Sequence, residues 1–186
     1  AERGQFVIAM MVAIINYEQA AEMAKIVTGQ GWDNWYDAME AEFLDIFDKA
    51  EEYQIFDAPL RERVLQFLRS HKAALDKLTE PRLAHCDLWA GNILIQKTDD
   101  RYWVCAMIDG DRATFGDPML DNATGWITSP EFSEGYGPTE NDPAAAERNR
   151  VYSLFFILQD AYIWKIEYGR EDIFSKDLRR LEEMLT

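Results

Sequence analysis

The sequence contains only two cysteines, Cys86 and Cys105, among its 186 residues. This number excludes a disulfide framework, and both residues lie in apolar segments, so we expect a reducing, cytoplasmic location. Long apolar runs are also missing. The run from Phe6 to Ile15 is too short for a membrane span, and we expect it to be core rather than a signal peptide.

Positive charge is scarce. Lys and Arg number 19 against 34 Asp and Glu, which gives a formal net charge of −15. Nucleic-acid binding requires a clustered basic surface, so we expect no nucleic-acid partner. An acidic surplus attracts cationic ligands, although it also simply keeps a surface soluble. The sequence does not indicate the oligomeric state.

The remaining composition is that of a folded chain. Hydrophobic residues make up 48 % and aromatic residues 13 %, which indicates one globular domain. The pattern predicts an α+β, mostly α-helical fold. Expected helices are 17–27, 33–53, 59–78, 144–168 and 172–185, and the turn-rich segment 129–147 reads as a loop or lid. Two strands, 92–96 and 103–108, are expected to form a hairpin around the polar residues between them.

The hairpin carries the candidate chemistry. "LAHCDLWAGNILI" places His85, Asp87 and Asn92 in apolar surroundings before the first strand, and Asp109 follows the second. A hairpin brings the start of its first strand beside the end of its second, so we expect Asn92 and Asp109 to converge near Asp87. One amide and one carboxylate suit Mg²⁺, which takes its other ligands from water and substrate phosphates. A further carboxylate can orient a hydroxyl nucleophile and accept its proton, as phosphoryl transfer requires.

Two linked motifs carry a resemblance to a known family. "HCDLWAGNIL" has the H-x-D-L-x-x-x-N spacing of kinase catalytic loops, and "IDGDRATFGDPMLD" follows it. Together they resemble the aminoglycoside phosphotransferase and choline kinase family more than protein kinases, whose D-F-G and A-P-E motifs are absent.

The resemblance implies a role for each matching position. It implies that Asp87 is the catalytic base and that Asn92 and Asp109 hold Mg²⁺. Asp111 either touches a second metal ion or pairs with Arg112.

Other motif positions read as support. His85 is expected to hydrogen-bond the loop rather than to transfer a proton, and Asp121 to cap a helix or brace the catalytic loop. Asp117 in the G-D-P segment more often stabilises a turn. Cys86, where the family usually has glycine, reads as a small buried side chain.

The resemblance also implies a lobe that this sequence does not show. Such kinases have a preceding β-rich lobe with a glycine-rich phosphate loop and a strand lysine. Neither G-x-G-x-x-G nor V-A-I-K occurs in the sequence. We therefore expect a protein-kinase-like C-terminal lobe over 17–186, with its catalytic loop at 85–92, its metal motif at 108–121 and its site on a small β-hairpin. Residues 1–16 would be a remnant of the hinge and the N-terminal lobe.

The expected activity is transfer of the ATP γ-phosphate to a hydroxyl of a small molecule, with ATP and Mg²⁺ as cofactors. Acids and aromatics downstream of the motifs suit an amine-bearing acceptor such as an aminoglycoside or amino sugar. The candidate acceptor residues are Trp126, Glu131, Glu134 and Tyr136. For any one of them, a solvated loop or core position is the alternative.

Other readings remain open at this point. The acceptor could be neutral or of another kind: a sugar, a fructosamine, a macrolide or a choline-like molecule. An inactive pseudokinase or binding module would have no chemical need to keep Asp87, Asn92 and Asp109 together. A metal-dependent phosphohydrolase would not explain the H-x-D-L-x-x-x-N spacing.

Overall fold

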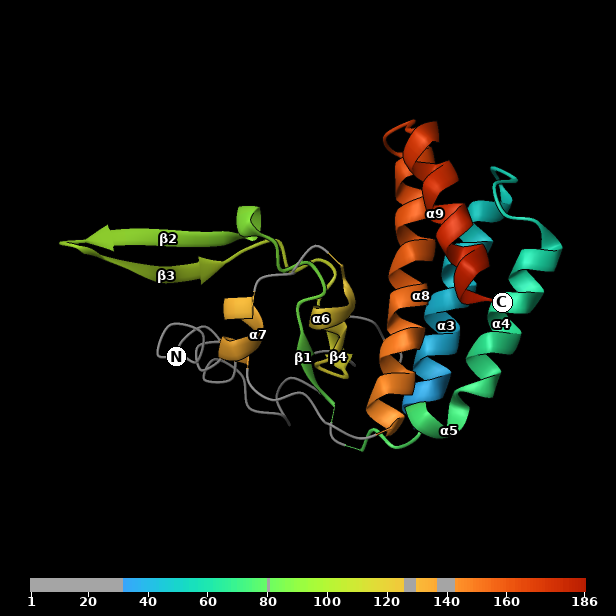
Figure 1. Ribbon diagram of the computed structural model, residues 1–186, viewed down its shortest axis with the longest axis horizontal. Helices are drawn as coiled ribbons and strands as arrows, with labels where there is room; N and C mark the ends of the chain where they lie inside the picture. The colour runs from blue at the N-terminus through green and yellow to red at the C-terminus, as the bar shows by residue number, and fades with distance from the viewer. Residues whose placement is uncertain (1–31, 80, 126–129, 137–142) are drawn as a thin grey trace. The chain divides into compact units, whose positions relative to one another are not determined.

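The computed structural model describes residues 32–79, 81–125, 130–136 and 143–186. The expected helix 17–27 and the expected hinge remnant 1–16 lie outside these ranges. The described residues fall into two compact units (Figure 1). We call residues 32–79 and 143–186 the helical unit, and residues 81–125 and 130–136 the strand unit.

The helical unit is built from α3 (Trp35–Glu51), α4 (Ala58–Ser70), α5 (Lys72–Leu75), α8 (Pro143–Ile166) and α9 (Glu171–Met184). The side chain of Asn34 accepts a hydrogen bond from Asp37 N and starts α3, and Asp57 does the same for α4. The helices α3, α8 and α9 agree with the expected ones within one or two residues.

The core of the helical unit is aromatic. Phe43 of α3 is fully buried, and its ring meets Phe155 of α8 edge-on at 5.4 Å between centroids. Nearby, Trp35 Nε1 donates a hydrogen bond of 2.8 Å to the hydroxyl of the fully buried Tyr152. These contacts bury apolar rings between α3 and α8, and the hydrogen bond fixes how the two helices align.

One expected helix is divided in two. The pattern predicted a single helix over 59–78, but α4 ends at Ser70 and α5 begins at Lys72. Between them, His71 has φ −100° and ψ 5°. Its Nδ1 lies 2.7 Å from Phe67 O and its Nε2 lies 2.8 Å from a carboxylate oxygen of Glu147 on α8. A tertiary partner thus holds His71 where a continuous helix would not place it.

The strand unit contains two antiparallel ladders. β2 (Ile93–Thr98) pairs with β3 (Arg101–Met107) and forms the expected hairpin, with Asp99 at its turn at φ 55°. A second ladder, β1 (Arg82–Ala84) with β4 (Thr114–Gly116), was not expected from the sequence.

Short helices complete the strand unit. They are the 3₁₀ turn η1 (Ala90–Asn92), α6 (Leu120–Ala123) and α7 (Pro130–Tyr136). The expectation of a continuous loop over 129–147 was wrong, because residues 130–136 are helical and α8 already begins at Pro143. Both helices start at a proline, whose fixed φ favours the first helical turn.

Among the described residues, no helix is both long enough and apolar enough to cross a lipid bilayer.

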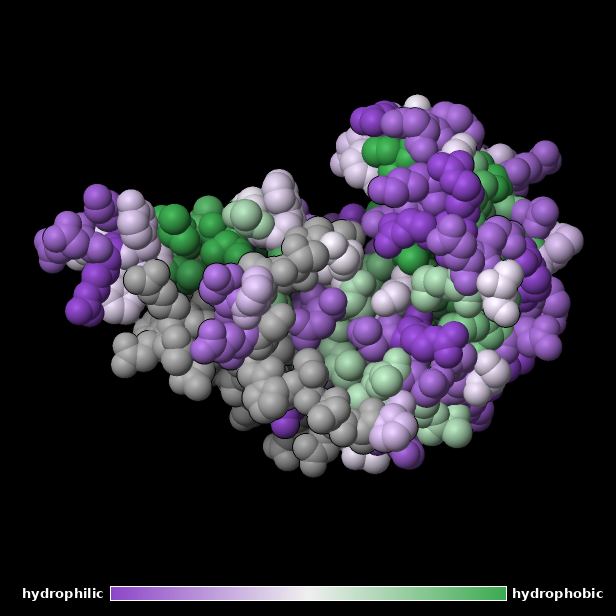
Figure 2. Space-filling view, in the orientation of Figure 1, coloured by the Kyte–Doolittle hydropathy of each residue, from purple (hydrophilic) through white to green (hydrophobic). Residues whose placement is uncertain are grey.

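The surface of the hairpin is unevenly polar. Hydrophobic side chains gather on the half next to the connecting loops, and hydrophilic ones occupy the tip (Figure 2). Leu94 and Ile95 on the hydrophobic half are 44 % and 60 % exposed.

Candidate active site

Two loops of the strand unit are placed side by side by the ladders that flank them. Residues 85–92 connect β1 to β2, and residues 108–113 connect β3 to β4. At one end Ala84 lies opposite Thr114, and at the other end Ile93 lies opposite Met107. The ladders therefore tie the two loops together at both ends. These loops contain all the residues that the sequence predicted for the base and the metal ligands.

The peptide groups of Ile108 are held by the first loop. The Ile108 N–H donates a hydrogen bond of 3.0 Å to Asn92 O, and His85 Nε2 lies 3.1 Å from Ile108 O. A carbonyl oxygen only accepts, so Nε2 carries the hydrogen and donates it. His85 is buried, and its Nδ1 has no hydrogen-bond partner within the described part of the chain. His85 thus holds the main chain of the residue just before Asp109.

Asp109 follows that held residue with φ 64° and an exposed side chain. Aspartate tolerates this left-handed conformation better than most residues. The side chain direction of Asp109 is therefore set by a backbone that Asn92 and His85 fix from the opposite loop.

Asp87 and Asn92 form a direct pair. Asn92 Nδ2 donates hydrogen bonds to Asp87 O at 2.9 Å and to Asp87 Oδ2 at 3.0 Å. Both partners are acceptors only, so the NH₂ group must face Asp87 and the amide oxygen Oδ1 must face away. Asn92 is 4 % exposed. This burial and pairing leave its Oδ1 oriented as a potential ligand.

The second carboxylate oxygen of Asp87 lies near a cation. Arg112 Nη1 is 4.0 Å from Asp87 Oδ1, and the two side chains are 31 % and 18 % exposed. Asp111 is exposed. The alternative in which Arg112 pairs with Asp111 does not hold in the described structure, where the acid nearest its guanidinium is Asp87.

Buried acids fix the catalytic loop and the turn after β4. Asp121, 1 % exposed, accepts a hydrogen bond of 2.7 Å from Cys86 N through its Oδ1. Cys86 is buried and has φ 61°, where glycine would be unstrained. Asp117 accepts a hydrogen bond of 2.9 Å from Met119 N within its own turn. Asp121 therefore bonds to the loop next to Asp87, and the hydrogen bond from Met119 N to Asp117 lies within the turn after β4.

The structure describes only some of the expected acceptor residues. Glu131 and Glu134 are exposed on α7. Trp126 and the side chain of Tyr136 lie outside the described residues. Within the described structure, no hydrogen bond or ion pair links Glu131 or Glu134 to the two loops.

The donor set fits a magnesium ion that has few protein ligands. Among the described residues, no three His, Cys, Asp or Glu side chains are grouped as a metal site. Mg²⁺ does not need such a group, because it keeps several waters and binds through one or two protein oxygens plus phosphates. The amide oxygen of Asn92, which faces away from Asp87, and the exposed carboxylate of Asp109 have the required chemistry.

Sequence reasoning gave no role to Trp89 and Gly91. Trp89 lies two residues after Asp87 and is 52 % exposed. A Cβ atom on Gly91 would lie 2.3 Å from the nearest carbon of the Trp89 indole. The signal was present in the sequence, since the first motif contains the tryptophan and the glycine.

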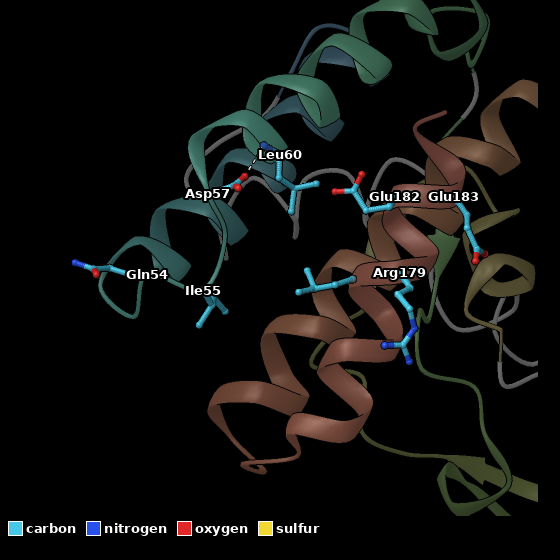
Figure 3. A pocket seen from close by; sticks show the side chains of 8 residues that line it. Gln54, Ile55, Asp57, Leu60, Arg179, Glu182 and Glu183 are labelled. Atoms are coloured by element: carbon cyan, nitrogen blue, oxygen red, sulfur yellow. Dashed lines mark hydrogen bonds between the residues drawn. The ribbon is translucent and has the colours of Figure 1, made fainter.

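A pocket in the helical unit lies apart from these loops in the sequence. It is lined by Gln54, Ile55, Asp57, Leu60, Leu178, Arg179, Glu182 and Glu183 (Figure 3). Asp57 is engaged as the cap of α4, and Glu182 accepts hydrogen bonds of 2.5 and 2.6 Å from the guanidinium of Arg63. Both acids serve the fold, and the pocket contains none of the predicted site residues.

The fold, mostly α-helical with two small antiparallel ladders, is a kinase-like fold. Residues 18–153 match the model of the phosphotransferase enzyme family, APH, and the chain belongs to that family. No curated protein sequence matches the chain significantly.

The fold is also found in a solved structure. A thermostable mutant of the aminoglycoside phosphotransferase APH(4)-Ia, in its apo form, superimposes with a TM-score of 0.55 at 20 % sequence identity. The match covers 83 % of this chain and 53 % of that one. The chain thus spans about half the length of this structure, and at this identity the likeness concerns the fold.

Proposed function

We propose that the protein transfers the γ-phosphate of ATP to a hydroxyl group of an amine-bearing small molecule, such as an aminoglycoside or an amino sugar. Family membership supports phosphotransfer. The observation that carries the proposal is the Asp87–Asn92 pair, with the backbone of Asn92 bonded to the residue before Asp109.

Asp87 is the proposed base. Its Oδ2 accepts from Asn92, which leaves Oδ1 to accept the proton of an acceptor hydroxyl. Arg112 lies 4.0 Å from this oxygen and offsets its negative charge. A positioned carboxylate of this kind contributes about 10²-fold or more to a proton-transfer step.

Asn92 and Asp109 are the proposed metal ligands. Asn92 Oδ1 and the Asp109 carboxylate would hold Mg²⁺, which when bound supplies positive charge to the phosphate oxygens. Asp111 is adjacent and exposed, and it is the proposed candidate for a second ion. Exposed apolar side chains next to the loops, Leu94 and Ile108, offer a surface for the nucleotide base.

The acceptor proposal rests on charge and on the structural neighbour. Glu131 and Glu134 are exposed on α7 of a chain with a net charge of −15. The superimposed structure is an aminoglycoside phosphotransferase by name. Both point to a cationic acceptor. We also propose a cytoplasmic location, since Cys86 and Cys105 form no disulfide bond.

The experiment measures ADP formation by the intact protein with ATP, Mg²⁺ and a panel of amine-bearing and neutral hydroxylated acceptors. We expect acceptor-dependent ADP formation, and we expect Asp87→Asn to lower turnover by about two orders of magnitude. Asp99→Asn is the matched control, because Asp99 is an exposed acid at the hairpin tip. Equal turnover in Asp87→Asn and the control would refute the base assignment. Neutral acceptors that outperform every amine would refute the cationic acceptor alone.

A further inference from the structure

Trp89 occupies an unusual position for a tryptophan. It lies in the catalytic loop, and its backbone N–H donates a hydrogen bond of 3.0 Å to Asp87 O. Its side chain is 52 % exposed. A tryptophan is a large apolar group that proteins normally bury. An indole left half in water, two residues after the proposed base, therefore has a surface that a ligand can cover.

Gly91 makes room for this indole. A Cβ atom on residue 91 would lie 2.3, 2.4 and 2.7 Å from three carbons of the Trp89 ring. Real Cβ atoms essentially never approach so closely, so the ring rests directly on the glycine backbone. Gly91 is needed here for space. Part of the indole therefore lies against the loop backbone, and the exposed remainder is open to a ligand.

We propose that the indole of Trp89 is the acceptor-binding surface of this site, on which the sugar ring or ammonium group of a hydroxylated amine stacks. The inference rests on the proposed function and deepens it. An acceptor hydroxyl must reach Asp87, and Trp89 is bonded to Asp87 through its main chain. The stacked face and the carboxylate together fix one group and one hydroxyl of the acceptor.

The indole serves the acceptor rather than the nucleotide. In the proposed function, Asn92 and Asp109 hold the Mg²⁺ that binds the nucleotide's phosphates. Leu94 and Ile108 provide a separate exposed apolar surface for the nucleotide base. An aromatic face also attracts an ammonium group electrostatically, which an aliphatic side chain does not. An exposed indole therefore suits the acceptor class named above.

The first experiment separates the two Michaelis constants of the intact protein. We expect Trp89→Ala to raise the KM of an amine-bearing acceptor about tenfold, while the KM of ATP changes less than twofold. Trp89→Phe keeps an aromatic face and should recover most of the loss, whereas Trp89→Leu, which keeps apolar volume without that face, should not. Tyr102→Ala, at a 56 % exposed aromatic on β3, is the control and should leave both constants unchanged.

The second experiment uses Gly91. The added methyl of Gly91→Ala must displace the indole, so this variant should raise the acceptor KM about as much as Trp89→Ala. In the Trp89→Ala background the same change should add less than twofold, because the clashing ring is gone. Additive effects of the two substitutions would overturn the proposal.

Two results separate this inference from the proposed function. If no hydroxylated acceptor stimulates ADP formation, the proposed function fails and the inference fails with it. If acceptors are phosphorylated but Trp89→Ala and Trp89→Leu leave the acceptor KM unchanged, or raise the KM of ATP instead, only the inference is overturned. Circular dichroism of each variant confirms that it is folded before the constants are compared.

Discussion

Asp121 provides the sharpest test of how the catalytic loop is held. Its carboxylate is 1 % exposed and accepts the N–H of Cys86, one residue before Asp87, at 2.7 Å. Asp121→Ala leaves that buried N–H without this acceptor. An unsatisfied buried donor costs about 1–3 kcal/mol. We expect the free energy of unfolding to fall by about 2 kcal/mol.

The same substitution should also slow the reaction. Without the anchor at Cys86 the loop carrying Asp87 can shift, and a displacement of about 1 Å costs roughly 10²-fold in rate. We therefore expect turnover to fall by one to two orders of magnitude. Asp121→Asn keeps an oxygen acceptor without the charge and should lose about half as much stability.

Asp177 provides the matched control. It is a buried acid of α9, in the helical unit, and its carboxylate accepts a hydrogen bond of 3.0 Å from Arg180. Asp177→Ala should lose a similar amount of stability in urea unfolding and keep turnover within about twofold. Turnover is measured as ADP formation by the intact protein at a temperature where circular dichroism shows both variants folded. Equal turnover losses in the two variants would refute a specific role of Asp121.

Three further predictions concern backbone conformation, pH and charge. Since Cys86 has φ 61°, Cys86→Gly should be about 1 kcal/mol more stable than Cys86→Ala in urea unfolding, and the reverse order would contradict a left-handed conformation there. Burial, together with the hydrogen bond to Glu40, raises the pKa of Tyr36 from 10.0 to about 12. Its neutral form therefore stabilises the fold fully below pH 10, and this stability is lost as the pH rises through about 12. We expect the denaturation midpoint of the unmodified protein to fall relative to that of Tyr36→Phe between pH 8.5 and pH 11. Salt should raise the acceptor KM more than that of ATP, because exposed charges are screened over about 8 Å, and Glu131→Lys or Glu134→Lys should raise it further; salt-independent constants would remove the acidic segment from the site.

The sequence predicts the elements that local patterns control. The hairpin follows from two apolar runs around a polar turn, and α8 follows from its apolar content. The division between α4 and α5 could not be predicted, because it depends on His71 meeting Glu147, 76 positions later in the chain. The ladder of β1 and β4 has three residues per strand, which is too short for an alternating pattern to show.

The residues of the site could be predicted from the sequence, but the contacts between them could not. The motif spacing pointed to Asp87, Asn92 and Asp109 as residues of one site. Nothing local indicates that both peptide groups of Ile108 are hydrogen-bonded by the first loop, or that Arg112 approaches Asp87 rather than the adjacent Asp111. Those contacts arise from two ladders that close at both ends of the loops, and a tertiary arrangement of this kind has no periodicity in the sequence.

In this site, buried polar side chains hold the two loops, and more exposed carboxylates are left for the chemistry. His85, Asn92 and Asp121 are at most 4 % exposed, and each makes a hydrogen bond to the main chain of a residue in the two loops. Asp109 is exposed, and 18 % of the Asp87 side chain remains exposed, so both carboxylates can be reached by a ligand. Buried hydrogen bonds form during folding, and the carboxylates are therefore oriented before any substrate binds. Groups oriented in advance need no reorganisation when charge moves in the transition state, so the proposed catalytic power of Asp87 also depends on His85 and Asp121, which have no proposed contact with a substrate.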